Sequence, residues 1–568
     1  MILSAERKIP ADIVLKGGKV VNVFSGQIHK KDVAISAGKI VGLGPDYHGK
    51  KDININGKWV TPGLIDGHIH IESSMLPPSR LAAALLVHGT TAVVADPHEI
   101  ANVTGMSGIK FMLEDSDFIP FDTFFMAPSC VPATTLETAG ATLRALDLAE
   151  LKDETRVLGL AEMMNFPGVL MGDHDILEKI LLFGDRIIDG HCPSLRGYDL
   201  QAYLTAGIRS DHESSDRLEG LEKMENGMMV MIREGTSAKN LEALLPLVKK
   251  GNARRFCFVS DDLHAEDIQE RGHLDFVVKK AMRLGLDPIT AVQLVTLNPA
   301  EYFGLKDRGA IAPGYRADLV VLDSLEKFKV NSVYKDGHLI VDNGALLHFP
   351  AGQKEASFIQ SKPLNIARLT PDSFRIPHPG GKARVIELVP GQIITRMVHE
   401  SLKSVDGWVL PDTESDTLKL CVVERHHASG RVGLGIVRGF GLRKGAMASS
   451  VAHDSHNVIA VGVSDDDIFR AVEAVRLIGG GLVVECDNEI IAQTPLEIGG
   501  LMSTQSIKTL VARLQGVKKA AFDLRCVLED PFMALSFLAL PVIPELKLTD
   551  RGLVDVNKFE IVPLFLES

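Results

Sequence analysis

The stretch TPGLIDGHIHIE, residues 61–72, decides the fold of this chain. Residues 63–66 (GLID) give a short apolar strand after a Pro-Gly turn, and two histidines follow two positions apart, His68 and His70. Side chains in a strand alternate between its faces, so these two imidazoles point the same way. Such a pair at the end of a buried strand can bind a metal ion, because each neutral ring offers one lone pair in a fixed direction. Two histidines in a polar loop are the alternative, since a bare HxH is common by chance.

Eight apolar runs, beginning with this one, alternate with helix-like stretches between residues 61 and 304. Buried strands that alternate with helical segments indicate a parallel sheet, and eight of them indicate a closed (β/α)8 barrel of the TIM type. The C-terminal ends of such strands meet at one mouth, where active sites are built. The runs are GLIDGHIH, TTAVVADPHE, DTFFMAPSC, RVLGLAEMM, RIIDGHCP, GIRSDHES, MVMIREGT and FCFVSDD.

Metal-binding residue types fall at the ends of these runs. A single His or Asp after a strand is usually a helix cap or a solvated loop residue. Together, an HxH pair, a carboxylate, two further histidines and an aspartate have the chemistry of a site for two divalent cations. Nitrogen and oxygen ligands without thiolate suit manganese, iron or zinc. The six predicted ligands are His68, His70, Glu162, His191, His212 and Asp261.

The barrel segment is flanked by β-rich sequence on both sides. ADIVL at residues 11–15 is echoed by ADLVVL at residues 317–322, and both lie among hairpin signals. The simplest interpretation is one small discontinuous β-sandwich domain, built from residues 1–60 plus 305–347. Coincidence between two β-rich segments is the alternative.

The C-terminal third reads as a separate domain. Residues 348–381 are rich in Pro, Gly, Ser and Lys and are predicted to be a linker. In residues 382–568, strands such as LKLCVVERH alternate with helical runs such as DDDIFRAVEAVRLI, which indicates an α/β or α+β layer domain.

Composition narrows the class of protein. With 568 residues the chain is too long for one core. A net charge of −12 argues against a nucleic-acid partner, which would need a basic face. Six cysteines without CxxC spacing fit reduced thiols in the cytosol. The chain shows no signal-peptide pattern and no apolar run of about 18 residues, so we expect a soluble cytoplasmic protein without a membrane partner.

Along its whole length the chain resembles the adenine deaminases, a family of the amidohydrolase superfamily. The superfamily signature is PGLIDGHIH, residues 62–70. The narrower match is carried by GHIHIESSMLPPSRLA, VVADPHEIANVTG, LAEMMNFPGV, DGHCPSLRG, SDHES and VSDD, and in the C-terminal region by ERHHASG and SSVAHDSHNV. Many superfamily members bridge two metals with a carboxylated lysine on the fourth strand. This chain has Glu162 there, so the resemblance implies Glu162 as the bridge.

The resemblance implies hydrolysis of adenine to hypoxanthine and ammonia by a homodimer, with manganese as the favoured metal. Fold and metal do not fix the substrate. The ligand set alone also permits a hydrolase of cyclic amides or N-acyl bonds, and a non-catalytic scaffold is the third alternative.

The predicted catalytic residues are Asp261 and Glu162. Deamination of an aromatic ring needs a nucleophile at neutral pH, and a metal-bound water has its pKa lowered toward about 7. Asp261 would take the proton of that water and return it to the leaving amine. The ring nitrogen beside the attacked carbon also needs a proton during addition.

Several polar residues keep more than one predicted role. Glu234, or a member of the group Asp96, His98 and Glu99, could supply the ring proton. That group could instead form a further metal site, a hydrogen-bond cluster or a helix cap. Arg233 and Glu234 could contact the purine edge or form an ion pair at the barrel rim. The clusters ERHH at 424–427 and HDSHN at 453–457 could form a third metal site or have solvated or interface roles.

Overall fold

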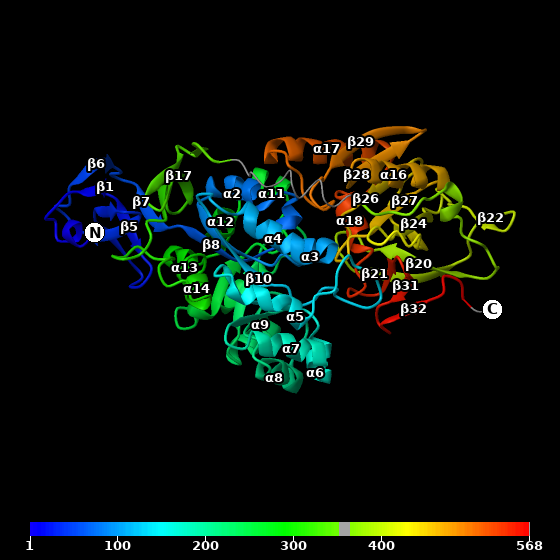
Figure 1. Ribbon diagram of the computed structural model, residues 1–568, viewed down its shortest axis with the longest axis horizontal. Coiled ribbons are helices and arrows are strands. Elements are labelled where there is room, and N and C mark those ends of the chain that lie inside the picture. The colour runs from blue at the N-terminus through cyan, green and yellow to red at the C-terminus, as the bar shows by residue number, and fades with distance from the viewer. Residues whose placement is uncertain (351–363, 567–568) are drawn as a thin grey trace.

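The computed structural model describes residues 1–350 and 364–566 and shows a mixed α/β molecule (Figure 1). At its centre lies a curled parallel sheet, which is consistent with a TIM-like domain. Five strands form one part of this sheet and three form the other, and each of the eight predicted runs contains one of them. The strands are β8 (Leu64–Ile69), β9 (Thr90–Ala95), β10 (Asp122–Ala127), β11 (Val157–Met163), β12 (Ile187–Gly190), β13 (Ser210–Asp211), β14 (Met229–Arg233) and β15 (Phe256–Val259).

The two parts of the parallel sheet meet at both ends. Arg209, just before β13, donates its backbone N–H to the carbonyl oxygen of Ile188 in β12 at 3.0 Å. At the other end, the backbone N–H of Asp261, just after β15, donates to the carbonyl oxygen of His68 in β8 at 3.0 Å. The first and last strands therefore lie side by side, and residues that are far apart in the sequence come together there.

Both faces of these strands are buried, which explains why their sequences are almost continuously apolar. Ala92 and Val94 of β9 belong to the same buried cluster as Cys257 and Val259 of β15. Val93, which points the opposite way, belongs to the cluster that contains the surrounding helices. These helices include α2 (Pro78–Leu86), α4 (Met106–Asp115), α7 (His174–Leu182), α8 (Gly197–Thr205), α9 (Arg217–Glu225), α11 (Ala265–Arg271) and α12 (Leu274–Arg283).

The two β-rich flanks share one sheet at the N-terminal end of the molecule. The antiparallel pairing of β7 (Trp59–Pro62) with β16 (Leu319–Ser324) joins them, and Val60 and Leu319 lie in one buried cluster. The order in this sheet is β19 (Ala345–Leu346), β18 (His338–Asp342), β17 (Lys329–Lys335), β16, β7, β2 (Lys19–Asn22) and β3 (Gln27–Lys30). A second sheet has the order β5 (Lys39–Leu43), β4 (Val33–Ser36), β1 (Ala11–Lys16) and β6 (Gly49–Asn54).

The C-terminal region has its own sheet of eight strands. Helix α16 (Asp465–Leu477) covers part of it, because Ile468, Val472 and Val475 lie on one face and are buried. Ser464 caps this helix by accepting from the Asp467 backbone N–H at 3.1 Å. The strand order is β21 (Thr395–Glu400), β20 (Ala383–Leu388), β25 (Val432–Arg438), β24 (Leu418–Val423), β27 (Val458–Gly462), β26 (Ala446–Ser449), β28 (Gly481–Cys486) and β29 (Glu489–Pro495). Of the predicted linker, residues 351–363 lie outside the described part of the chain.

The C-terminal region rests on the mouth of the parallel sheet, and we call this contact the seam. Helix α17 (Ile507–Asp523) packs against α11 and α2 (Figure 1). Lys518 of α17 pairs there with Glu266 of α11. Lower on the seam, the carboxylate of Asp550 accepts from the backbone N–H and the hydroxyl of Thr138 at 2.8 and 2.7 Å. Within the described residues, no helix combines the length and the apolar character needed to cross a membrane.

Candidate active site

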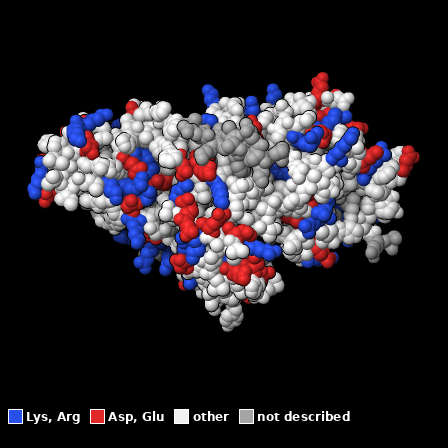
Figure 2. Space-filling model, viewed as in Figure 1, with Lys and Arg blue, Asp and Glu red and all other residues white. Residues whose placement is uncertain are grey.

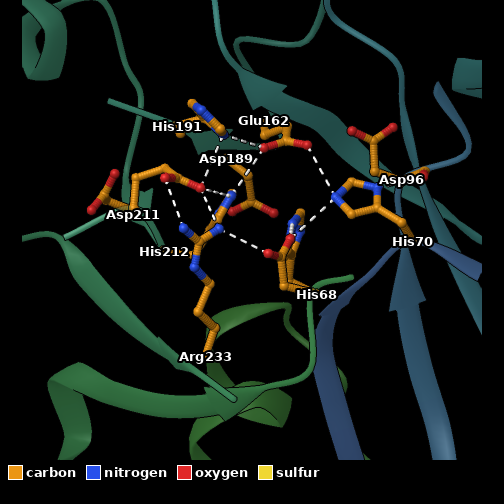
Figure 3. A network of polar contacts seen from close by, with 12 residues as sticks. His68, His70, Asp96, Glu162, Asp189, His191, Asp211, His212 and Arg233 are labelled. Atoms are coloured by element: carbon orange, nitrogen blue, oxygen red, sulfur yellow. Dashed lines mark hydrogen bonds and ion pairs between the residues drawn. The ribbon is translucent and has the colours of Figure 1, made fainter. Parts of the chain in front are cut away.

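The six predicted ligands lie together at the C-terminal ends of the strands (Figure 3). Each comes from a strand or from the first residues after it, so the backbone of the sheet fixes where each side chain starts. His191 is half-buried and the other five are buried. Their sources are β8 for His68 and His70, β11 for Glu162, β12 for His191, β13 for His212 and β15 for Asp261.

Glu162 lies at the centre of this group. Its Oε1 is 3.2 Å from His70 Nε2, whereas its Oε2 is 2.7 Å from His191 Nδ1 and 3.0 Å from His212 Nε2. Burial alone would raise the pKa of Glu162, but the adjacent His212 and His191 hold it well below its usual range. The carboxylate is therefore ionised, and its two oxygens face two different groups of imidazoles.

Asp261 closes the group on the opposite side. Its Oδ1 is 3.4 Å from His68 Nε2 and 3.3 Å from His70 Nε2, and its Oδ2 accepts from Arg233 Nη1 at 2.8 Å. Burial opposes ionisation, yet the Arg233 charge and the two imidazoles keep the pKa of Asp261 well below its usual range. Arg233 also forms an ion pair with Glu213, whose Oε2 accepts from Arg233 Nη2 at 2.8 Å.

These residues fit a divalent cation centre. His68 Nε2 is buried and makes no hydrogen bond to any described residue, so this ring nitrogen can still bind a ligand. The ligand atoms of His68, His212 and Asp261 all lie within 4.8 Å of one another, as do those of Glu162, His191 and His212. Imidazole nitrogens and ionised carboxylates without thiolate are ligands for manganese, iron or zinc.

The group Asp96, His98 and Glu99 divides between two environments. His98 Nδ1 is 3.0 Å from Asp96 Oδ2 and 3.6 Å from Glu162 Oε1, so these two residues lie beside the ligand group. Glu99, on α3 (His98–Thr104), turns toward the C-terminal region and pairs with His453 and His456 there.

Glu234 and Cys192 lie away from the ligand group. Glu234 accepts from Lys280 Nζ at 2.8 Å and lines a small separate cavity with His273 and Phe276. Cys192, adjacent to His191, donates its backbone N–H to Asp211 Oδ1 at 3.0 Å and is buried outside the ligand group.

Asp66 supports the ligands from behind, a role that the sequence analysis missed. This fully buried carboxylate accepts from the backbone N–H of His68 at 3.2 Å and from the Ser260 hydroxyl at 2.6 Å, and it lies 2.9 Å from His273 Nε2. It thereby ties β8 to the end of β15. The sequence signal for this role was an aspartate within an apolar run, because a carboxylate buried in a strand needs several hydrogen-bond partners.

A cavity lies at the seam. On the side of the parallel sheet it is lined by Glu72, which follows His70 by two residues, and by Asp262, the neighbour of Asp261. Burial raises the pKa of Glu72 to about 7. Residues of the C-terminal region complete the lining, among them His453, His456, Phe532 and Ser536.

Comparison with known families and proteins matches both halves of the chain. Residues 59–340 match the Amidohydrolase family, and residues 392–560 match the Adenine deaminase C-terminal domain. The chain is 48% identical to the adenine deaminase of Desulfatibacillum aliphaticivorans over 567 residues, which covers 100% of this chain and 99% of that protein. It is 46% identical to the adenine deaminase of Geobacillus kaustophilus over 570 residues, covering 99% of this chain and 98% of that protein.

Among solved structures, D-hydantoinase is similar with a TM-score of 0.46 and 17% identity, covering 60% of this chain and 97% of that chain.

Proposed function

This chain belongs to the adenine deaminase family of amidohydrolases, and on that premise we propose how its residues bind metal and move protons. The reaction is the hydrolytic deamination of adenine to hypoxanthine and ammonia. The observation that carries our proposal is the position of Glu162, whose two oxygens face two different groups of histidines.

The family implies a divalent metal, and we propose a pair of cations shared by Glu162. His68, His70 and Asp261 would hold one cation, and His191 and His212 the other. Manganese is the proposed metal, with iron or zinc as alternatives, because the ligands are nitrogen and oxygen only. A bound divalent cation lowers the pKa of water toward about 7 and so supplies a nucleophile at neutral pH.

Asp261 is proposed to carry the proton. Its ionised carboxylate takes a proton from the attacking water and passes it to the exocyclic nitrogen of adenine, so that the C–N bond breaks and ammonia leaves. Arg233 already binds Asp261 and Glu213, which supports a positioning role for it. Glu234 is engaged with Lys280, whereas Asp96 and His98 remain candidates for substrate contact.

We also propose how the chain divides into domains. Residues 61–304 would form a closed (β/α)8 barrel, residues 1–60 plus 305–347 a discontinuous β domain, 348–381 a linker, and 382–568 an α+β domain.

The proposed location is the cytoplasm, because six buried free cysteines support a reducing compartment. Figure 2 shows Lys and Arg interspersed with Asp and Glu on the face drawn, which supports a small-molecule partner over nucleic acid. A homodimer is proposed from the family resemblance alone.

The test is ammonia release by manganese-loaded protein from a panel of purines, pyrimidines and cyclic amides. We expect adenine to have the highest kcat/KM. The His68→Ala protein should lose metal and activity together, because it lacks one ligand. A higher kcat/KM for a cyclic amide would overturn the assignment, and full metal content with full turnover in His68→Ala would overturn the proposed centre.

A further inference from the structure

The cavity at the seam is lined in part by histidines from outside the barrel. His453 and His456 lie after β26 in the C-terminal region and contact Glu99 on α3 of the barrel. We propose that His453 is a catalytic residue of the deamination, donating from Nε2 to a ring nitrogen of adenine and giving that nitrogen its proton. This inference rests on the proposed function of the barrel site and adds a residue from a different domain to it.

Glu99 fixes how the two histidines are oriented. Its Oε1 is 2.7 Å from His453 Nδ1, and its Oε2 contacts His456 Nε2. A carboxylate accepts hydrogen bonds, so both of these nitrogens donate to Glu99. All three side chains are buried. Burial raises the pKa of Glu99, but the charge of His453 and the hydrogen bonds from both histidines hold it well below its usual range, so Glu99 is ionised.

The geometry of His456 argues against a third metal site here. Its Nδ1 accepts from the backbone N–H of Ala452 at 3.1 Å, so the single hydrogen of the neutral ring is on Nε2, the atom that faces Glu99. A metal would need a lone pair on that same atom. Burial and the nearby charges of His453 and Arg425 lower the pKa of His456 to about 4, so the ring stays neutral.

His453 differs from His456 in having one ring nitrogen free. Its Nδ1 donates to Glu99, and its ring stacks on Phe537 with centroids 4.9 Å apart and an interplanar angle of 26°. Its Nε2 makes no hydrogen bond to any residue that the structure describes, and the residue lines the cavity. Against the effect of burial, Glu99 raises the pKa of His453 to about 9. Nε2 therefore carries a hydrogen that a ligand in the cavity can accept.

Adenine offers the matching chemistry, since its ring nitrogens accept hydrogen bonds. When hydroxide forms a bond to C6, the C6–N1 double-bond electrons move to N1, which takes the proton from His453 Nε2. Asp261 then passes the proton it took from water to the amino group, the C6–N bond breaks and ammonia leaves. N1 keeps its hydrogen in hypoxanthine, and the proton of the C6 hydroxyl, released as the carbonyl forms, restores His453, so the atoms balance.

The test uses full-length His453→Ala and His453→Gln, with His427→Ala as the matched control. His427 also crosses the seam, because its Nε2 lies 3.1 Å from the carbonyl oxygen of Ala139, but it is exposed and does not line the cavity. We expect kcat for adenine to fall about 10²- to 10⁴-fold in both His453 variants, as for a lost general acid, with metal content unchanged. Added imidazole should restore part of kcat in His453→Ala.

Deaza analogues identify the atom that accepts the hydrogen bond. Wild type should bind 1-deazaadenine more weakly than adenine, and His453→Ala should lose that preference. A His453→Gln protein with the kcat of His427→Ala would overturn the inference, and so would metal loss in a folded His453→Ala or an undiminished preference against 1-deazaadenine. If His453→Ala does not fold, the kcat of His453→Gln alone tests the inference. Failure of wild type to release ammonia from adenine would instead refute the proposed function.

Discussion

Glu162 is the residue whose charge the ligand group depends on most, because its two oxygens face histidines on both sides. Glu162→Gln keeps the shape but removes the charge. We predict loss of at least one metal and a fall in kcat by orders of magnitude. Metal analysis beside steady-state kinetics measures this. Two tightly bound metals and a normal rate in the variant would show that Glu162 is not shared.

Asp261 should matter more to turnover than to binding. An amide at this position still accepts from Arg233, but it cannot carry a proton. At matched metal occupancy, Asp261→Asn should lower kcat about 10²- to 10⁴-fold and change KM little. A loss confined to KM would mean that Asp261 only positions the substrate.

Lys547 gives a prediction about pH. This lysine of β30 (Leu546–Thr549) is fully buried and donates to the carbonyls of Ile393 and Phe537 at 2.9 and 3.0 Å. Burial lowers its pKa from 10.5 to about 7. Between these values the unfolded chain holds a proton that the folded protein lacks, so stability rises with pH in this window and is flat below pH 7.

Relative to Lys547→Met, wild type should therefore gain about 1.4 kcal/mol of unfolding free energy per pH unit between pH 7 and 10. Unfolding midpoints measured across this range test it. The exposed Lys558→Met is the control and should run parallel to wild type. If the unfolding free energies of Lys547→Met and wild type changed with pH in parallel, the buried Lys547 would not be neutral.

At the scale of single elements, β8 is held in register by Asp66, which binds the end of β15. Asp66→Ala should lower the free energy of unfolding by about 3–5 kcal/mol, since it breaks a buried charged network. It should also weaken metal binding, because His68 loses its backbone anchor. Denaturant unfolding and metal analysis measure both. Asp52→Ala, on the exposed strand β6, should stay within about 1 kcal/mol of wild type, and equal losses in both would contradict this role.

The eight strands could be predicted because local sequence decides them. Short apolar runs between helical patterns are compatible with few structures other than buried strands. The ligands at their ends followed from the geometry of parallel strands. The partners of Glu99 could not be predicted, because His453 lies more than three hundred residues away and no local pattern shows which part of the C-terminal region covers the ends of the parallel strands. Asp66 and Glu72 were missed because they lie within a motif that the two histidines already explained.

At the scale of the whole molecule, the seam should control access to the cavity. Asp550 is buried and accepts from Thr138, which follows β10 of the parallel sheet, and Arg431 Nη1 lies 3.3 Å from Asp550 Oδ2. Asp550→Ala should cost about 1–3 kcal/mol, because the half-buried N–H and hydroxyl of Thr138 lose a charged acceptor. Hydrogen exchange should quicken at residues 135–138 and 453–457, whereas the peripheral Lys558→Met should leave it unchanged. Exchange equal to wild type at both segments would show that the seam does not depend on Asp550.

The sheet shared by the two flanks sets an order of events for a chain leaving the ribosome. Strand β7 is made early, yet its partner β16 begins only at Leu319. At about 5–20 residues per second, β7 waits roughly 10 to 50 s for that partner. The sheet of β1, β4, β5 and β6 needs only residues 11–54 and can form meanwhile. A ribosome that stalls before residue 319 therefore presents an unpaired strand edge directly ahead of β8, the kind of surface to which neighbouring nascent chains and chaperones bind.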